Sequence, residues 1–421
     1  MKSPVLSILF LLISVTLLAV PNDFRFRHFS VEDGLSSNSV RAIMQDKYGF
    51  LWIGTEEGLN RYDGIMIKSY SICPQAAGKY ISSLYGTKKN IWIGTDEGIY
   101  IYAYATETFT YFDLTTPNNV RITSIVNHIL QDKDGNLWFS TNGQGLFRYN
   151  LSKNYLEQYE FTSAFGIVAS TMADSDNQIW ALTNQGESGV YKLNKAENKF
   201  EPFGLLYNAG NHHSQALAML EDSEQTLWLG TWECGLQKID KYTRQTTTYL
   251  HPTDGKGVTH IHSLMEYAPH QLLIGSDDGL LLFNTLTEEY KLFTENETVP
   301  NSLSNRFVYP IIKDREGGIW IGTYYGGINY ISPNAEQFES FSHSRLYNSI
   351  NGNVIGRFCE DAHGQIWIAS DDGGLNRYSP KDRKFVYYLP ADHKNSLSYH
   401  NVHAPVSYTH LRAPRDISGS R

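Results

Sequence analysis

Short hydrophobic runs alternate with polar turns along nearly the whole chain. Within residues 40–70, four runs of four to six residues are separated by turns rich in Asp, Gly and Glu. Runs of this length are typical of β-strands, and Asp and Gly suit the tight turns between them. The pattern therefore predicts units of four short antiparallel strands.

The same unit recurs eight times, and most copies contain a phrase like Leu51-Trp52-Ile53-Gly54-Thr55. Leu273 takes the place of tryptophan in the sixth copy. The tryptophans that anchor the other copies are Trp52, Trp92, Trp138, Trp180, Trp228, Trp320 and Trp367. Four strands every 40 to 48 residues predict an all-β fold, a β-propeller, in which each unit is one blade.

Two details that repeat from unit to unit have structural explanations. An aspartate stands six residues before tryptophan in six units, where it suits a hairpin turn. The residue two after tryptophan is small in seven of the eight units, which indicates close approach of another backbone. Both features indicate a scaffold rather than a reactive site.

The number of blades depends on a segment that precedes the first unit. Residues 24–29 resemble an extra outer strand, which could complete the last blade of a seven-bladed ring formed by residues 21–335. The unit around Trp367 would then be the first blade of a second propeller, over residues 336–403. A single eight-bladed ring is the alternative, and periodicity alone does not decide between them.

The N-terminus has the character of an export signal. Lys2 precedes an uncharged, apolar run from Pro4 to Val20, which predicts a signal peptide over residues 1–20, cleaved near Ala19. Leu17 stands where a small residue is preferred, so an uncleaved anchor is the alternative. No second apolar stretch of about 20 residues predicts a membrane span.

Composition excludes other classes of protein. The 44 acidic and 35 basic residues give a net charge of −9, which argues against direct contact with nucleic acid. Three cysteines in 421 residues cannot form a disulfide framework. The 13% of aromatic residues argues against disorder, and the repeat accounts for most of them.

The repeated units resemble the two-component regulator propeller family over about residues 22–403. The resemblance rests on whole phrases, among them Gly58-Leu59-Asn60-Arg61-Tyr62, Gly322-Thr323-Tyr324-Tyr325-Gly326-Gly327 and Gly373-Gly374-Leu375-Asn376-Arg377-Tyr378. Such repeats form the periplasmic sensor of the large hybrid two-component systems of gut Bacteroidetes. We therefore expect an extracytoplasmic sensor whose parent is anchored in the inner membrane.

The resemblance also implies an architecture and a function. Family members carry two seven-bladed propellers, a β-sandwich, a membrane helix, a histidine kinase, a receiver and a DNA-binding domain. They work as dimers, detect glycan-derived oligosaccharides and control genes for glycan use by phosphorelay. This chain has no kinase segment, so we expect a non-enzymatic N-terminal fragment without a cofactor or metal. Residues 404–421 lack the repeat and carry three Arg and two Pro, which predicts a non-native tail.

Candidate ligand-binding residues come from loops expected on one face of the propeller. Sugar binding needs an aromatic platform and planar polar groups. Trp232 is the one tryptophan outside the repeated phrase and is the first candidate. The further candidates are Tyr324, Tyr325, Glu233, Asn305, Arg306, His212 and His213. His212 and His213 could also form a metal site with His260 and His262, but a surface position is favoured.

Two other functions remain open. The spacing Asp-x-x-Gly-x-x-Trp is similar to the Asp-box of sialidase-like glycosidases, so a propeller glycoside hydrolase or lyase is one alternative. The repeated phrases supply no cluster of arginines, and the blade count does not suit six. A protein-interaction scaffold is the other alternative.

Overall fold

The computed structural model is an all-β protein in which nearly all regular structure is strand. It describes residues 24–72, 79–161, 166–183, 189–205, 215–251, 257–296, 298–299, 301–333, 341, 343, 348–391 and 396–405. The predicted signal segment 1–20 and residues 406–421 of the predicted tail lie outside this set. Within it, no helix is long and apolar enough to span a membrane.

Each four-stranded antiparallel sheet is one blade, and in blades 1 to 6 the strands run outward from the ring centre in chain order. Blades 1 to 3 contain β2 (Val40–Gln45), β3 (Leu51–Thr55), β4 (Gly58–Tyr62) and β5 (Ile67–Tyr70); β6 (Ile81–Gly86), β7 (Asn90–Thr95), β8 (Gly98–Ala103) and β9 (Thr108–Tyr111); and β10 (Val126–Gln131), β11 (Leu137–Thr141), β12 (Leu146–Asn150) and β13 (Tyr155–Tyr159). Blades 4 to 6 contain β14 (Val168–Ala173), β15 (Ile179–Thr183), β16 (Gly189–Asn194) and β17 (Lys199–Leu205); β18 (Ala216–Glu221), β19 (Leu227–Thr231), β20 (Leu236–Ile239) and β21 (Thr246–Tyr249); and β22 (Ser263–Ala268), β23 (Gln271–Ser276), β24 (Gly279–Asn284) and β25 (Tyr290–Phe293).

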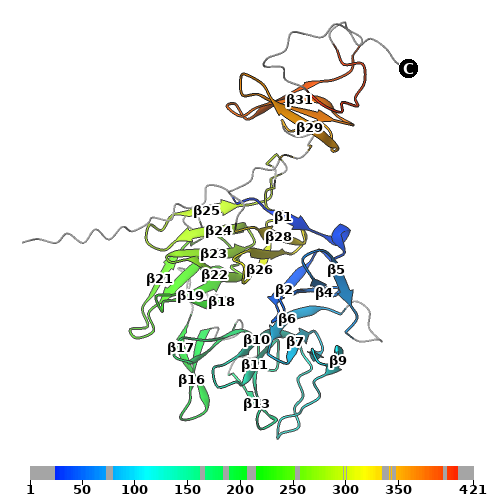
Figure 1. Ribbon diagram of the computed structural model, residues 1–421. Helices are drawn as coiled ribbons and strands as arrows, with labels where there is room; N and C mark the ends of the chain where they lie inside the picture. The colour runs from blue at the N-terminus through cyan, green and yellow to red at the C-terminus, as the bar shows by residue number, and fades with distance from the viewer. Residues whose placement is uncertain are drawn as a thin grey trace, which may run out of the picture.

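Blade 7 joins the two ends of the ring. It contains β26 (Val308–Lys313), β27 (Ile319–Thr323), β28 (Ile328–Ile331) and, as its outermost strand, β1 (Arg27–Phe29). Arg27 pairs with Tyr330, and Phe29 pairs with Ile328. The seven innermost strands contact one another in a closed cycle, with β26 beside β2 (Figure 1). The seven-bladed prediction is therefore confirmed, and the eight-bladed alternative is wrong.

An eighth sheet lies apart from this ring (Figure 1). It consists of β29 (Ile355–Glu360), β30 (Ile366–Ser370), β31 (Gly374–Ser379) and β32 (Lys384–Tyr388). Its innermost strand is largely exposed, with Phe358 74% accessible, whereas the innermost strands of the ring pack against their neighbours. This sheet is thus built as a blade that has no neighbouring blade among the described residues.

A hydrogen bond between aspartate and tryptophan fastens the first turn of most blades to the core. In blade 1, Trp52 is 1% exposed, and its Nε1 donates to Asp46 Oδ2 at 2.8 Å. Asp46 Oδ1 also accepts the backbone N–H of Phe50, 3.0 Å away. The same Asp–Trp bond, here called the clasp, holds Trp52, Trp138, Trp180, Trp228, Trp320 and Trp367. The aspartate therefore does more than shape the turn.

Blade 2 has no clasp. Its first turn is one residue shorter, and Thr87 stands where the blades with a clasp have aspartate. Thr87 Oγ1 accepts the backbone N–H of Asn90 at 3.0 Å, but the buried Nε1 of Trp92 has no partner among the described atoms. Blade 6 avoids the problem differently, because Leu273 has no donor to satisfy.

Small residues let neighbouring blades approach near the ring centre. A Cβ atom on Gly54 would lie 2.5 Å from Ile81 Cγ2 and 3.2 Å from the carbonyl oxygen of Ile81 in the next blade. The expected close approach is thus confirmed. Thr55, which follows, donates from Oγ1 to the Gly58 carbonyl at 3.0 Å and closes the turn.

Removing one clasp should destabilise the ring measurably. We expect Asp132→Ala to lower the free energy of unfolding by about 2–3 kcal/mol, because Trp138 Nε1 and the turn amide lose a charged acceptor. Urea denaturation followed by tryptophan fluorescence measures this. Thr87→Ala, in the blade without a clasp, is the matched control and should cost less. Equal losses would contradict a special role for the clasp.

Candidate functional site

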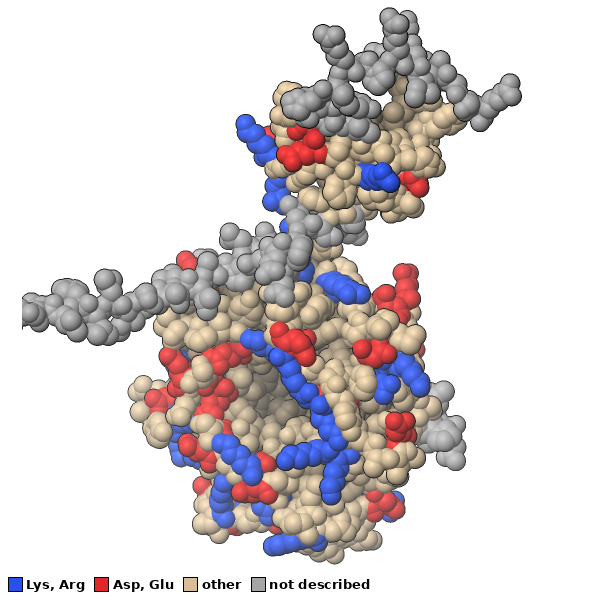
Figure 2. Space-filling model, viewed as in Figure 1, with Lys and Arg blue, Asp and Glu red and all other residues tan. Residues whose placement is uncertain are grey.

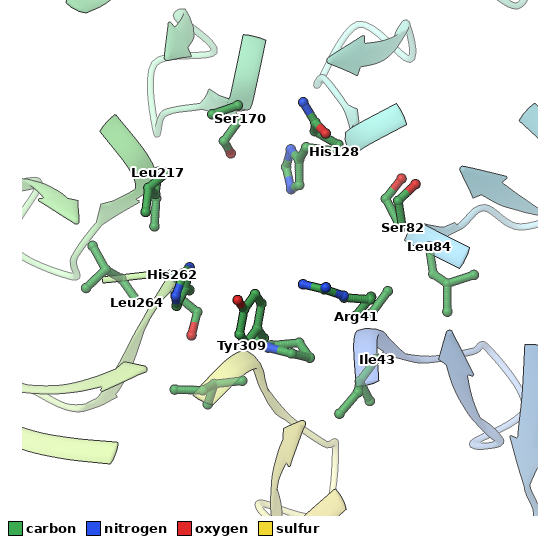
Figure 3. A pocket seen from close by; sticks show the side chains of 18 of the residues that line it. Arg41, Ile43, Ser82, Leu84, His128, Ser170, Leu217, His262, Leu264 and Tyr309 are labelled. Carbon is green, nitrogen blue, oxygen red and sulfur yellow. The ribbon is translucent and has the colours of Figure 1, made fainter. Parts of the chain in front are cut away.

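The centre of the ring holds a cavity of about 510 Å³, lined by side chains from all seven innermost strands (Figure 3). Figure 2 shows the ring hollowed at its centre, with Lys and Arg side chains along the edge of the hollow on the face in view. We call the end at which the innermost strands begin the mouth. The loops that enter these strands and the turns between second and third strands surround it.

A β-bulge places one side chain of most innermost strands at the mouth. In blade 1, Val40 pairs with Thr55 and Ala42 pairs with Gly54, so Arg41 is an extra residue between them. Bulges re-aim a side chain out of the regular alternation. The bulge residues that line the cavity are Arg41, Ser82, Asn127, Ala169, Leu217 and, in a longer bulge with Pro310, Tyr309.

These positions make the mouth asymmetric. Ala169 and Leu217, from blades 4 and 5, are apolar. Arg41, Tyr309 and His262 come from the adjacent blades 1, 7 and 6 and point toward the cavity centre (Figure 3). The bulge residues are thus polar in blades 7, 1, 2 and 3 and apolar in blades 4 and 5, so the lining is not that of a symmetric pore.

Arg41 is the centre of an aromatic cluster. Its guanidinium carbon lies 4.4 Å from the ring centroid of Tyr324 and 4.8 Å from that of Tyr309. Its Nε donates to Glu56 Oε1 at 3.1 Å. Burial would lower the pKa of Arg41, but Tyr80 and Glu56 outweigh it and raise the pKa, so the guanidinium stays charged.

One carboxylate holds two histidines on the other side of Tyr309. Asp277 Oδ1 accepts from His262 Nε2 at 2.8 Å, and Oδ2 contacts His260 Nδ1. In both bonds the ring N–H of the histidine points toward the carboxylate, which fixes the tautomer of each neutral imidazole. Burial would raise the pKa of Asp277, but the bonds from the two histidines outweigh it and lower the pKa.

Stacked rings connect the two groups. The His262 and Tyr309 rings are parallel within 12°, with centroids 4.2 Å apart. His260 stacks on Trp232 at 3.7 Å, and Tyr309 stacks on Tyr324 at 5.7 Å. The result is a continuous aromatic arc over blades 5, 6 and 7 that reaches Arg41 in blade 1.

His128 lies deeper in the channel. Burial lowers its pKa to about 4, although a hydrogen bond to the backbone of Thr171 opposes the shift. The imidazole is therefore neutral at physiological pH and can both donate and accept a hydrogen bond.

The structure separates the predicted ligand residues. Trp232 and Tyr324 belong to the aromatic arc. Tyr325 meets Tyr324 edge-on at 4.3 Å and is 62% exposed. None of the described candidates lines the cavity itself. Of those outside the arc, Glu233 is exposed, Asn305 Nδ2 donates to Glu295 at 3.2 Å, and the guanidinium carbon of Arg306 lies 4.8 Å from the Phe307 ring centroid. His212 and His213 lie outside the described residues.

Several residues of the site were missed in the sequence. Arg41 and Tyr309 were not candidates, and His260 and His262 were expected at the surface. A signal existed for two of them, because Arg41 and Tyr309 each follow the buried valine that opens an innermost strand. No group of three or more His, Cys, Asp or Glu side chains that could hold a metal occurs among the described residues.

Comparison with known proteins identifies the repeat. The family model for the two-component regulator propeller matches residues 34–57, 121–143, 302–325 and 349–372. Histidine kinase P4 of Formosa agariphila is 46% identical over 68 residues, which is 16% of this chain and 5% of that protein. The match is strong but local.

Solved structures extend the likeness to the whole ring. The extracellular domain of a hybrid two-component system from B. thetaiotaomicron superposes with a TM-score of 0.65 at 26% identity, covering 87% of this chain and 49% of that one. This chain thus spans about half the length of that domain. Virginiamycin B lyase from Staphylococcus aureus shares the fold at 14% identity, with a TM-score of 0.57 over 74% of this chain and 99% of that one.

The Asp277 carboxylate should make stability depend on pH. Its pKa is lowered in the folded protein, so it stabilises the fold above the unfolded pKa, and this contribution is lost as pH falls through the folded pKa. We therefore expect Asp277→Asn to be less stable than the wild type at pH 7 and to approach it below pH about 4. Urea denaturation across this range measures the difference. A difference that does not change with pH would contradict the lowered pKa.

Proposed function

Because this chain is built from two-component regulator propeller repeats, we propose that its ring is the ligand-sensing part of a hybrid sensor histidine kinase and that the mouth binds a glycan-derived oligosaccharide. In this proposal the parent protein works as a homodimer, and binding outside the cytoplasm controls a phosphorelay and the transcription of glycan-utilisation genes. The similarity to extracellular domains of hybrid two-component systems supports the sensor role.

The aromatic arc beside the cavity is the observation that carries the proposal for the ligand. Sugars present C–H faces to aromatic rings and paired hydroxyls to planar polar groups. The arc offers Trp232 and Tyr324, and Arg41, Asp277 and the histidines supply donors and acceptors beside it. A volume of about 510 Å³ also falls within the range of about 300–1,000 Å³ typical of small-molecule sites.

A signal from this site requires that the ligand distinguish two states. A ligand shifts an equilibrium only by the difference between its affinities for the two states. Each blade packs against the next, and most blades are held internally by a clasp, so we place the two states in the arrangement of rings or protomers rather than inside the ring. A disulfide that locks such an arrangement in a full-length relative should then abolish induction.

Truncating the arc should weaken oligosaccharide binding. We expect Trp232→Ala and Tyr309→Ala each to raise the dissociation constant at least about tenfold, because each removes stacking and contact area worth more than about 1.4 kcal/mol. Isothermal titration with the best member of a labelled oligosaccharide panel measures this. Tyr242→Ala is the control, because Tyr242 is 86% exposed in the turn that leads into β21.

The same panel separates the alternative functions. Unchanged affinity in both arc variants, with unchanged melting temperatures, would contradict binding at the mouth. Release of new reducing ends or unsaturated products would support a hydrolase or lyase. The similarity to virginiamycin B lyase concerns the fold alone. Recovery of a protein partner, with no sugar bound, would support the scaffold.

A further inference from the structure

Charged groups around the mouth occur in opposite pairs. Arg41 is the one Lys or Arg among the described residues that line the cavity, and it bonds Glu56 through both Nε and Nη2. At the next blade Lys79 forms a close ion pair with Glu97. The positive side chains nearest the ligand space therefore already have anionic partners.

Two further acidic groups of the mouth, Asp277 and Asp278, are satisfied locally. Asp277 accepts from two histidines, as described above, and Asp278 Oδ2 accepts the N–H and the hydroxyl of Thr259 at 2.8 and 3.0 Å. The balance of charge leans negative, because Asp277 and Asp278 face histidines and a threonine rather than Lys or Arg. Among the described residues that line the cavity, Arg41 is the one Lys or Arg, and Glu56 already occupies it.

From this pairing we propose that the mouth selects an uncharged oligosaccharide and discriminates against glycans that carry uronate or sulfate groups. The inference rests on the proposed function and specifies its ligand class. An anionic group that reached Arg41 would have to displace Glu56 and leave that carboxylate without its partner. It would also approach Asp277 and Asp278, and like charges brought together at a binding site cost several kcal/mol.

Hydroxyl groups meet no such obstacle. A carboxylate has about four acceptor positions, and Arg41 uses only Oε1 of Glu56, so a hydroxyl can donate to the other oxygen without breaking the pair. In their neutral forms, His260 and His262 present an acceptor on the nitrogen opposite the one that meets Asp277. The mouth thus offers hydroxyl groups both donors and acceptors, while its charge leans negative.

Basic residues elsewhere do not change this assignment. Arg306 is exposed over Phe307 and does not line the cavity. Lys47 follows the other end of β2, away from Arg41, and its Nζ donates to the carbonyl of Lys88 at 2.7 Å. Arg315, after β26, likewise donates to backbone carbonyls of blade 1.

A glycan array tests the proposal, with each backbone present in a neutral form and in a uronate or sulfated form. The full purified chain should bind a neutral member at least about tenfold more tightly than its acidic counterpart. Glu56→Gln frees Arg41 and should raise affinity for acidic members at least about threefold. Glu157→Gln is the matched control, because it removes a carboxylate from the Arg148–Glu157 pair on β12 and β13 and should change nothing.

The outcomes separate this inference from the function on which it rests. Binding of acidic members as tightly as neutral ones by the wild type, or a Glu56→Gln variant with unchanged discrimination, would overturn the charge-pairing inference and leave the sugar sensor intact. Failure of the wild type to bind any member would overturn both. Melting temperatures within about 2 °C of the wild type confirm that each variant is folded.

Discussion

The pairing of β1 with β28 is the contact on which the rest of the ring depends. It joins the first described strand of the chain to the last blade, and it leaves no open edge inside the cycle. Closure then sets blade 1 against blade 7 at both ends of their innermost strands. Ser39 Oγ donates to the Tyr324 carbonyl at 2.6 Å at the mouth, and the Arg315 amide donates to Gln45 Oε1 at 3.0 Å at the other end. Without this seam, Arg41 could not meet Tyr309 and Tyr324.

The repeated frame and the variable site use different positions of the same strands. Tryptophan, the clasp aspartate and the small residue two after tryptophan pack against neighbouring blades, so their identity is fixed by volume and hydrogen bonding. The bulge residue is not packed between two blades and points into the channel. It varies from Arg41 through Ala169 to Tyr309 without disturbing a blade. Specificity can therefore change while the ring stays the same.

This division explains how much the sequence could predict. Strand order, the anchors and the extra strand at residues 27–29 were readable because local pattern and packing repeat in every unit. The clasp was read only as a turn, because the sequence does not show that Asp46 reaches the indole of Trp52. Trp232 and Tyr324 were selected from the sequence as unusual aromatics in loops, and their role as ligand-binding residues stays a prediction.

The remainder of the site depends on contacts that no local pattern encodes. Asp277 meets His260 and His262 across 15 to 17 residues, because the entry to β22 and the turn after β23 converge at the mouth. Arg41 meets Tyr309 only through ring closure. A bulge also breaks the alternation of side chains from which the two faces of a strand are inferred. The side chain at the bulge therefore points in a direction that simple alternation does not predict.

The same closure limits how such a ring can transmit a signal. Each blade shares its core with the next, and the contacts at the seam are as tight as those elsewhere, so a ligand at the mouth meets groups that are already in place. Binding free energy is then not spent on reshaping blades. It is available to favour one placement of the ring relative to a neighbouring domain or protomer. The exposed strand β29 of the eighth sheet is one surface of this chain that could take part in such a contact. Under the proposed function, specificity would therefore belong to the mouth and the signal to the contacts outside the ring.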